Sequence, residues 1–396
     1  MYKKTLDDRS VNTLKGMLLF AFLLIAFSAA VFYLHFKQSV SGLYYLPDFE
    51  SDMSVYVRLM DGTMEGGCSY PLLLKVGAFF LLFLNNYTAM AATTTLLHML
   101  ALVAEYYYVR KAIVSEDRSL RSEVTAAVLT AALFLVSMLF DPRKMMYPIY
   151  LGVGTPNAFH SPTLIAAKPF AIAVFFIFCG MLRDNGGKTE PKDAVALALM
   201  LFLCDMAKPS YPLLFLSAAG LTEAFRLIKY RFRNYKEALV LLLCVLPTLL
   251  YMLYQSTVEF GEDAGTICFG VGTVWKAYQK NIPLAILKNS AFPIAVLAFN
   301  FKELKNSFSY RFAWFQYAVG FAEYFFLYEN GSRMYDGNFE WGYQYGMFFL
   351  FTVSAIVLVR SGNSKKKKTV QWIVFALHLV CGLLYFRKLL LGGTFG

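Results

Sequence analysis

Apolar runs of about twenty residues recur from one end of this chain to the other, and they limit what it can fold into. Such a run can cross about 30 Å of hydrocarbon as a helix, because each helical residue advances the chain by about 1.5 Å. The composition agrees, since 58% of the 396 residues are hydrophobic and only 16% are charged. The sequence therefore predicts an all-α polytopic membrane protein that forms one integral membrane domain over residues 1–396.

Hydropathy predicts about eleven transmembrane helices, the first of them a retained signal anchor. The apolar run over residues 72–84 is left out of this count. It has only thirteen residues and follows Tyr70-Pro71, which suits a re-entrant or juxtamembrane helix in the first outer loop better than a span. The predicted spans are residues 17–36, 88–109, 124–140, 163–182, 194–207, 210–227, 238–255, 283–300, 312–328, 342–360 and 370–386.

The distribution of basic residues predicts the orientation of the chain. A net charge of +11 would suggest a nucleic-acid partner in a soluble protein, but here Lys and Arg gather in short segments between the apolar runs. If the N-terminus is cytoplasmic and residues 72–84 do not cross, six cytoplasmic segments hold 24 of the 37 basic residues. We therefore expect a multi-pass protein of the cell membrane with a cytoplasmic N-terminus and no nucleic-acid partner.

The first outer loop is rich in carboxylates, with five acids in the eighteen residues from position 48 to position 65. Residues 48–62 have the apolar stripe of an amphipathic helix, which would lie on the bilayer and hold acids at the level of the headgroups. The alternative is a solvated loop, and it fits Asp52 least, because Asp52 begins the stripe four residues before Tyr56. The five acids are Asp48, Glu50, Asp52, Asp61 and Glu65.

The second outer loop adds a further acid and two polar side chains. Asp141 stands at the outer end of the third predicted span; two alternatives are that it ends that helix before Pro142 or pairs with Arg143. Asn157 and His160 come directly before the fourth span, in a loop whose glycines and prolines would let the backbone approach a ligand. The pattern predicts a ligand site on the outer face.

Three cations are expected on the same side, where positive charge is otherwise sparse. Lys168 and Lys208 fall within apolar segments, and Arg333 lies in a late outer loop. Phosphate is the natural ligand for such a group. The alternatives are that either lysine reaches the membrane surface along its own stem, or that Lys208 pairs with Asp205. The late loop also offers polar edges and an aromatic face suited to a sugar, from Asn338, Glu340 and Trp341.

The order of these features resembles the GT-C superfamily of membrane glycosyltransferases, which use polyprenyl-phosphate-linked sugar donors. The likeness is carried by "DMSVY" from Asp52, by "YPLLLKVGAFFLLFL" from Tyr70, and by Asp141. It covers about residues 1–185 and leaves residues 186–396 as a more variable transmembrane part. The usual Asp-Glu pair is replaced here by Asp52-Met53. The later "AKPS" and "GNFEWGY" are similar to stretches of bacterial surface-polysaccharide enzymes.

This resemblance implies a glycosyltransferase that moves a sugar from a polyprenyl-phosphate donor to a cell-envelope glycan or glycolipid on the external face of the membrane. It implies catalytic roles for Asp52 and Asp141, and it leaves the need for a divalent cation open. The cations Lys168, Lys208 and Arg333 would bind the donor phosphate. Substrate contacts would come from Glu50, Asn157, His160, Asn338, Glu340 and Trp341.

Two other functions would fit parts of this sequence. A polysaccharide polymerase that joins lipid-linked repeat units would use similar chemistry on a larger acceptor. A transporter or flippase would be expected to carry charges in the middle of its spans and inverted repeats, and the sequence shows little of either.

Overall fold

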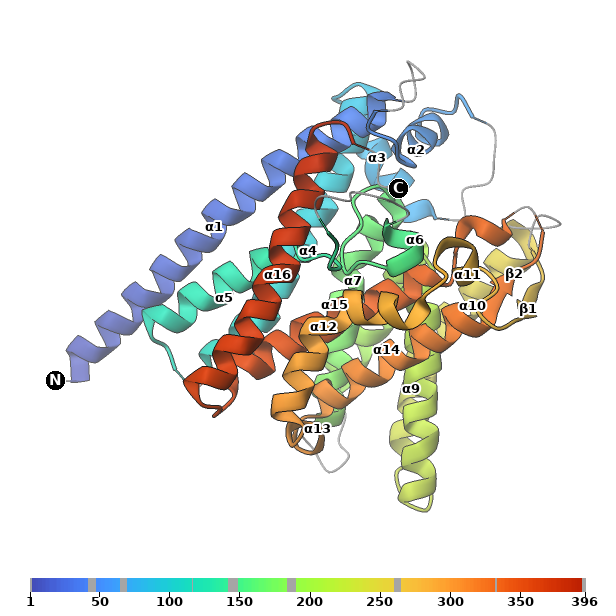
Figure 1. Ribbon diagram of the computed structural model, residues 1–396. Helices are drawn as coiled ribbons and strands as arrows, with labels where there is room; N and C mark the ends of the chain where they lie inside the picture. Colours follow the sequence, from blue (N-terminus) through green and yellow to red (C-terminus); the bar gives the residue numbers. More distant parts are fainter. Residues whose placement is uncertain are drawn as a thin grey trace.

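The structure is a computed structural model that describes residues 2–41, 48–64, 70–115, 117–141, 149–183, 190–259, 265–331 and 333–393. Within these ranges the chain is almost entirely helical (Figure 1), as the sequence predicts. Eight of the described helices are long and apolar enough to cross a membrane, which supports a polytopic membrane protein. They are α1 (Tyr2–Ser41), α4 (Asn86–Val114), α7 (Pro162–Arg183), α9 (Ser210–Lys229), α10 (Tyr235–Tyr254), α12 (Ile282–Asn300), α15 (Glu340–Arg360) and α16 (Lys365–Leu390).

The other three predicted spans also contain helices, namely α5 (Leu120–Leu133), α8 (Pro191–Ala207) and α14 (Phe308–Phe326). Each of the eleven predicted segments therefore contains a helix, and eleven membrane crossings remain a prediction. The largest departure is α5, which was expected to continue to residue 140 but ends at Leu133. Its fourteen residues extend about 21 Å, which is less than the hydrocarbon thickness.

Short elements cover the upper end of the bundle in Figure 1. They include α3 (Pro71–Leu81), whose eleven residues extend only about 16 Å, in agreement with the prediction that residues 72–84 do not cross. Two short strands, Ile267–Phe269 and Leu327–Glu329, pair antiparallel with Cys268 opposite Tyr328. They join two loops for which the sequence predicted no contact. The remaining elements are α2 (Met53–Met60), α6 (Ile149–Val153), η2 (Gln255–Glu259), β1 (Ile267–Phe269), α11 (Trp275–Tyr278), β2 (Leu327–Glu329), η4 (Met334–Asp336) and, at the lower end of Figure 1, α13 (Glu303–Asn306).

Local sequence signals set where these helices begin. Pro71, Pro162 and Pro191 each occupy the first residue of a helix, where the missing proline N–H costs nothing because that N–H would have no partner within the helix. The side chain of Asn85 accepts a hydrogen bond of 3.0 Å from the backbone N–H of Thr88 and so caps the start of α4. The cap separates α3 from α4, which explains why two apolar runs close together in sequence do not form one long helix.

Helix α15 is the centre of the fold. Every residue from Glu340 to Leu358 is buried, and the helix packs against α4, α9, α12 and α14. The ring of Phe349 stacks on that of Phe175 in α7, with 4.4 Å between the ring centroids. A helix surrounded on all sides needs no polar face, which explains why α15 is apolar around its whole circumference.

The residues that follow α5 run extended across α16 instead of continuing the predicted span. Their backbone would be costly to bury without partners, and α16 supplies several. The backbone N–H of Ser137 donates to the carbonyl of His378 at 3.2 Å, and Nδ1 of His378 lies 2.7 Å from the carbonyl oxygen of Ser137. Gly382 lets the two segments meet, because a Cβ atom there would lie 1.6 Å from the Leu135 carbonyl oxygen.

Substituting Gly382 with alanine should therefore destabilise the protein by about 1–3 kcal/mol, because backbone atoms would have to move to admit the methyl group. A lower midpoint of thermal unfolding in detergent would be the measured result. Gly180→Ala in α7 is the matched control, since a Cβ there would meet no atom within 4 Å. Equal stability of the Gly382 and Gly180 variants would contradict this account of the crossing.

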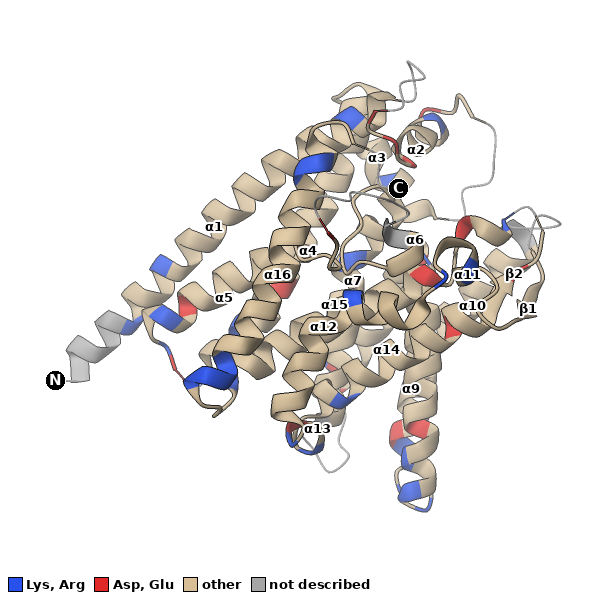
Figure 2. Ribbon diagram, in the orientation of Figure 1, with Lys and Arg blue, Asp and Glu red and all other residues tan. Residues whose placement is uncertain are grey.

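The basic residues gather at the end of the bundle opposite the short elements. In Figure 2, Lys and Arg cluster at the turn between α9 and α10, around α13 and at the start of α16, all toward the lower end. These are segments that the charge bias assigns to the cytoplasm. The cytoplasmic orientation of this end remains a prediction from the loop charges.

Candidate functional site

The break between α8 and α9 places a lysine at the upper end of the bundle. Pro209 disfavours a helical conformation in the residue before it, and Lys208 accordingly has an extended backbone with φ −169° and ψ 127°. Helix α8 therefore ends at Ala207, where the N–H of Lys208 still donates to the carbonyl of Cys204 at 2.8 Å. The proline that separates the two helices also fixes the position of the Lys208 side chain.

Lys208 is buried among polar and aromatic groups from three other elements. Its Nζ donates to Oγ1 of Thr163, in the first turn of α7, at 3.2 Å. The same nitrogen lies 4.8 Å from the ring centroid of Trp341 in α15 and 5.9 Å from that of Tyr70, directly before α3. These contacts fix a cation at the point where α3, α7, α8 and α15 meet.

Helix α2 brings Asp52 to this lysine. The helix is shorter than the predicted stripe of residues 48–62 and begins at Met53, so Asp52 occupies the residue just before it. The backbone N–H of Asp52 donates to the carbonyl of His160 at 3.1 Å, which ties the start of α2 to the loop before α7. Two loops that are far apart in sequence are thus joined beside Lys208.

The charges of Asp52 and Lys208 act on each other. Desolvation by the surrounding protein raises the pKa of the Asp52 carboxyl, and the Lys208 ammonium opposes this rise. Asp52 as a whole residue remains exposed, so solvent weakens both effects. Burial lowers the pKa of Lys208 to about 8, while Asp52 acts to raise it. Lys208 therefore stays mostly protonated at neutral pH and presents a positive charge beside the carboxylate.

His160 forms the neutral part of the site. It is buried, and its ring centroid lies 5.6 Å from that of Trp341. Burial lowers the pKa of His160 to about 3, and the Lys208 charge acts in the same direction. The imidazole is therefore uncharged at physiological pH and adds no second cation beside Lys208.

Further charges, from the loop of Asp52 itself and from the loop before α15, reach this site electrostatically. Glu50 and Asp336 act on Asp52, and Arg333 acts on Lys208. Nε of Arg333 lies 3.5 Å from Oδ2 of Asp336 and 4.0 Å from Oε2 of Glu329. The structure thus brings five of the predicted residues to one end of the bundle with Asp52, namely Glu50, His160, Lys208, Arg333 and Trp341.

Lys168 and Asn157 lie elsewhere, in the interior of the bundle. Nζ of Lys168 donates to Oδ1 of Asn157 at 2.6 Å and lies 4.0 Å from the ring centroid of Phe348. Nδ2 of Asn157 donates to the carbonyls of Leu133 and Val136 at 2.8 and 3.0 Å. It thereby caps the C-terminal end of α5. Both side chains are engaged in holding helices together, which differs from the phosphate and substrate contacts predicted for them.

The other predicted residues also have local partners. The residues next to Asp141 attach to other helices, since the N–H of Leu139 donates to the carbonyl of Lys288 in α12 at 2.8 Å. Nδ2 of Asn338 donates to Oε2 of Glu329 at 2.9 Å. Glu340 is buried, and its Oε1 accepts from Nε2 of Gln344 at 3.1 Å. None of these described contacts brings Asp141, Asn338 or Glu340 to Lys208.

Trp341 was expected to offer an aromatic face to a sugar, but only 6% of its surface is exposed. Its ring covers Lys208 and His160 instead. Gly337 helps to bring the chain there, because it ends η4 with a φ of +65°, which favours glycine, just before α15 begins. The ring of Trp341 therefore packs over the Lys208 ammonium and stabilises its charge by a cation–π interaction.

The sequence interpretation missed three residues that interact with the two predicted lysines. Thr163 and Tyr70 line Lys208, and a hydroxyl directly after Ser161-Pro162 at a helix start was a usable signal for the first of them. Glu105 is fully buried in α4 and interacts electrostatically with Lys168. An acidic side chain inside the predicted span 88–109 is unusual, and this was the sequence signal for Glu105.

The described side chains around Asp52 form no cluster of metal ligands. In the described ranges, no three His, Cys, Asp or Glu side chains gather as a metal site would require. Asp52 also has the positive charge of Lys208 as a neighbour. The chemistry inferred below therefore uses only side chains of the protein.

No protein-family model, no curated protein and no solved structure matches the chain. A function therefore has to be inferred from the chemistry of the site around Asp52 and Lys208.

Proposed function

We propose that the protein is a GT-C-type glycosyltransferase of the cell membrane. It would transfer a sugar from a polyprenyl-phosphate donor to a glycan or glycolipid of the cell envelope on the external face. The observation that carries this proposal is a carboxylate with a raised pKa beside a buried, charged lysine, at the end of the bundle opposite the basic turns.

This arrangement suits the two needs of sugar transfer from a lipid phosphate. Asp52 would accept the proton of an acceptor hydroxyl as that oxygen attacks the anomeric carbon. The bond from the anomeric carbon to the phosphate oxygen would break, and the leaving phosphate would gain negative charge. Lys208, with Arg333 near it, would stabilise that charge in a partly water-excluded setting.

A transporter is the second candidate, because Glu105 and Lys168 place two charges deep among the helices. Their surroundings argue against a transport path. Lys168 is bonded to Asn157, Glu105 accepts from Thr352 at 2.6 Å, and the cavity beside Lys168 has a volume of about 20 Å³. That volume holds about one water molecule. The pair therefore fits a structural role better than a substrate path.

The enzyme proposal is tested by a transfer assay with purified full-length protein and a panel of polyprenyl-phosphate-linked sugars. We expect release of the carrier phosphate from at least one donor. Lys208→Gln should weaken donor use by about tenfold or more, because it removes a charged hydrogen-bond donor from the phosphate. Lys192→Gln is the matched control, since Lys192 is exposed and pairs only with Glu190 on the surface in the described contacts. No release from any donor would refute the enzyme proposal.

The orientation is tested by cysteine labelling in intact cells, in a background that lacks Cys68 and Cys268. A cysteine at Thr63, exposed just after α2, should react with an impermeant thiol reagent. A cysteine at Ser364, exposed just before α16, should react only after the cells are opened. The opposite pattern would place the candidate site on the cytoplasmic face and would contradict the proposal.

A further inference from the structure

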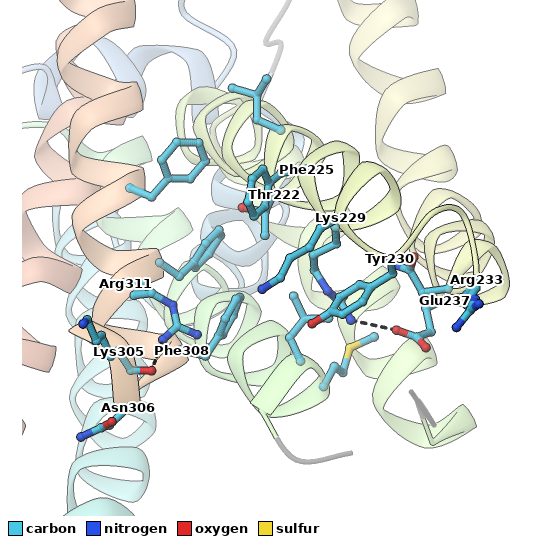
Figure 3. A pocket seen from close by; sticks show the side chains of 17 residues that line it. Thr222, Phe225, Lys229, Tyr230, Arg233, Glu237, Lys305, Asn306, Phe308 and Arg311 are labelled. Carbon is cyan, nitrogen blue, oxygen red and sulfur yellow. Dashed lines mark hydrogen bonds and ion pairs between the residues drawn. The ribbon is translucent and has the colours of Figure 1, made fainter. Parts of the chain in front are cut away.

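A large, open cavity lies at the opposite end of the molecule from the candidate site. It has a volume of about 1320 Å³ and is lined by the ends of α7, α9 and α14, by α13 and by the turn into α10. Ordinary small-molecule pockets measure roughly 300–1,000 Å³, so this cavity can hold a large ligand. Figure 3 shows its polar residues reaching in from several of these elements.

The lining is strongly basic. Five of its seventeen residues are Lys or Arg, against one carboxylate, Glu237. Glu237 is already engaged, because it accepts from Arg226 at 2.8 Å. Four cations remain, and within the described part of the chain none of them forms an ion pair. These four are Lys229, Arg233, Lys305 and Arg311.

Two of these cations face each other across the cavity. In Figure 3, Lys229 extends from α9 and Arg311 from α14, from opposite walls. Arg311 is held in place, because its Nη1 donates to the carbonyls of Leu304 and Lys305 at 2.8 and 2.7 Å. An anion placed between these two walls would interact favourably with both charges. The arrangement therefore favours an anionic ligand.

A buried amide in the same lining also lacks a partner. Asn234 is 9% exposed, and among the described residues neither its Oδ1 nor its Nδ2 has a hydrogen-bond partner. Buried polar atoms are almost always satisfied, so both atoms require a ligand or water within the cavity. This requirement is independent of the charges and also indicates a polar group there.

Part of the lining is apolar and continues to the outer surface of the bundle. Phe225, Phe312 and Phe315 line the cavity, and Phe225 is 66% exposed on α9, a helix long and apolar enough to lie in a membrane. A ligand that touches all of these residues needs both a negative head and a hydrocarbon part. A small soluble anion would leave the phenylalanines uncovered.

From these observations we propose that the cavity binds an anionic phospholipid of the cytoplasmic leaflet. Its phosphate would lie between Lys229 and Arg311, near the amide of Asn234, and an acyl chain would lie along the phenylalanines. The cavity belongs to the basic end of the molecule, where the charge bias predicts the cytoplasm. This proposal does not depend on the sugar-transfer activity proposed above.

Native mass spectrometry of the detergent-purified, full-length protein can test the proposal with phosphatidylglycerol as the probe and phosphatidylcholine as the zwitterionic comparison. The wild-type protein should prefer phosphatidylglycerol. Lys229→Gln combined with Lys305→Gln should weaken this binding by about thirtyfold, because each basic side chain near an anionic lipid contributes about fivefold. Both lysines are exposed, so the fold should tolerate the change.

The matched control is Lys366→Gln with Lys367→Gln, which removes two exposed lysines from the same end of the molecule but outside the cavity. This control should leave phosphatidylglycerol binding unchanged. Equal losses in the two double variants, or no loss in either, would overturn the site. Displacement of phosphatidylglycerol by an equal concentration of inorganic phosphate would show that the ligand is not a lipid. The acyl chains of a bound lipid should add to its affinity, so phosphate alone should not compete.

Discussion

Replacing Asp52 with asparagine is expected to slow sugar transfer by about a hundredfold or more while leaving the fold intact. Asparagine keeps the size of the side chain but cannot accept the acceptor proton. The backbone bond from Asp52 to His160 does not involve the side chain and should survive. Stability should change by no more than about 0.5 kcal/mol, as for an exposed residue. Transfer rate, donor binding and thermal stability are the quantities to compare.

Two neighbouring acids provide the matched controls. Asp48 and Glu50 are exposed in the same loop; Asp48→Asn should keep most of the activity, and Glu50→Gln should lose less activity than Asp52→Asn. Full activity of Asp52→Asn with loss in one neighbour would move the base to that neighbour. Full activity in all three variants would remove the loop from the mechanism.

The pH dependence provides a second readout for the same residue. The raised pKa of Asp52 keeps its carboxyl protonated to a higher pH than an ordinary aspartate. A protonated carboxyl cannot act as a base, so transfer should fall as the pH drops through this raised pKa. Because the Lys208 ammonium acts to lower that pKa, Lys208→Gln should move the acid-side inflection to higher pH. An unmoved inflection would mean that another group is the base.

Replacing Lys168 with methionine is expected to destabilise the protein by about 3–5 kcal/mol, the largest stability effect that we foresee. The substitution removes the donor to Asn157 and leaves Glu105 buried without its positive neighbour. The rings of Phe134 and Phe348, 4.6 and 4.0 Å from Nζ, would also lose their cation. A much lower yield of folded protein and a lower unfolding temperature in detergent are the expected results.

A double variant separates this electrostatic role from simple packing. Lys168→Met combined with Glu105→Gln removes both charges, so it should recover part of the stability lost in the single variant. If the single and double variants are equally unstable, the loss comes from the Asn157 contact or from packing. A stable single variant with altered transfer activity would instead support the donor-phosphate role that the sequence predicts for Lys168.

The helices were largely predictable because their hydrophobic runs carry the information. Each predicted span contains a helix, and the short run before α4 ends where Asn85 caps the next helix. The end of α5 was not predictable in this way. Residues 134–140 are as apolar as a span, but they leave the helix because His378 and Asn157 satisfy the backbone there. Such partners lie more than twenty residues away, so a sliding hydropathy window cannot register them.

The candidate site was predictable in its residue types but not in their grouping. Asp52, Lys208 and His160 stood out as polar residues at the ends of apolar runs, and they do come together. Lys168 and Asn157 had the same appearance in sequence, yet they bond to each other inside the bundle. A buried lysine can bind a substrate or hold helices together, and only the three-dimensional partners distinguish the two uses.

The central position of α15 also bears on how the protein is made. This helix fills the middle of the bundle, but it begins at Glu340, after most of the chain has been synthesised. Helices α4, α7 and α9 enter the membrane earlier and must wait for the surface that they finally contact. Until α15 is made, the faces of α4, α7 and α9 that finally contact it lack this partner. The core of the bundle is therefore completed only when this late helix packs between helices that were made before it.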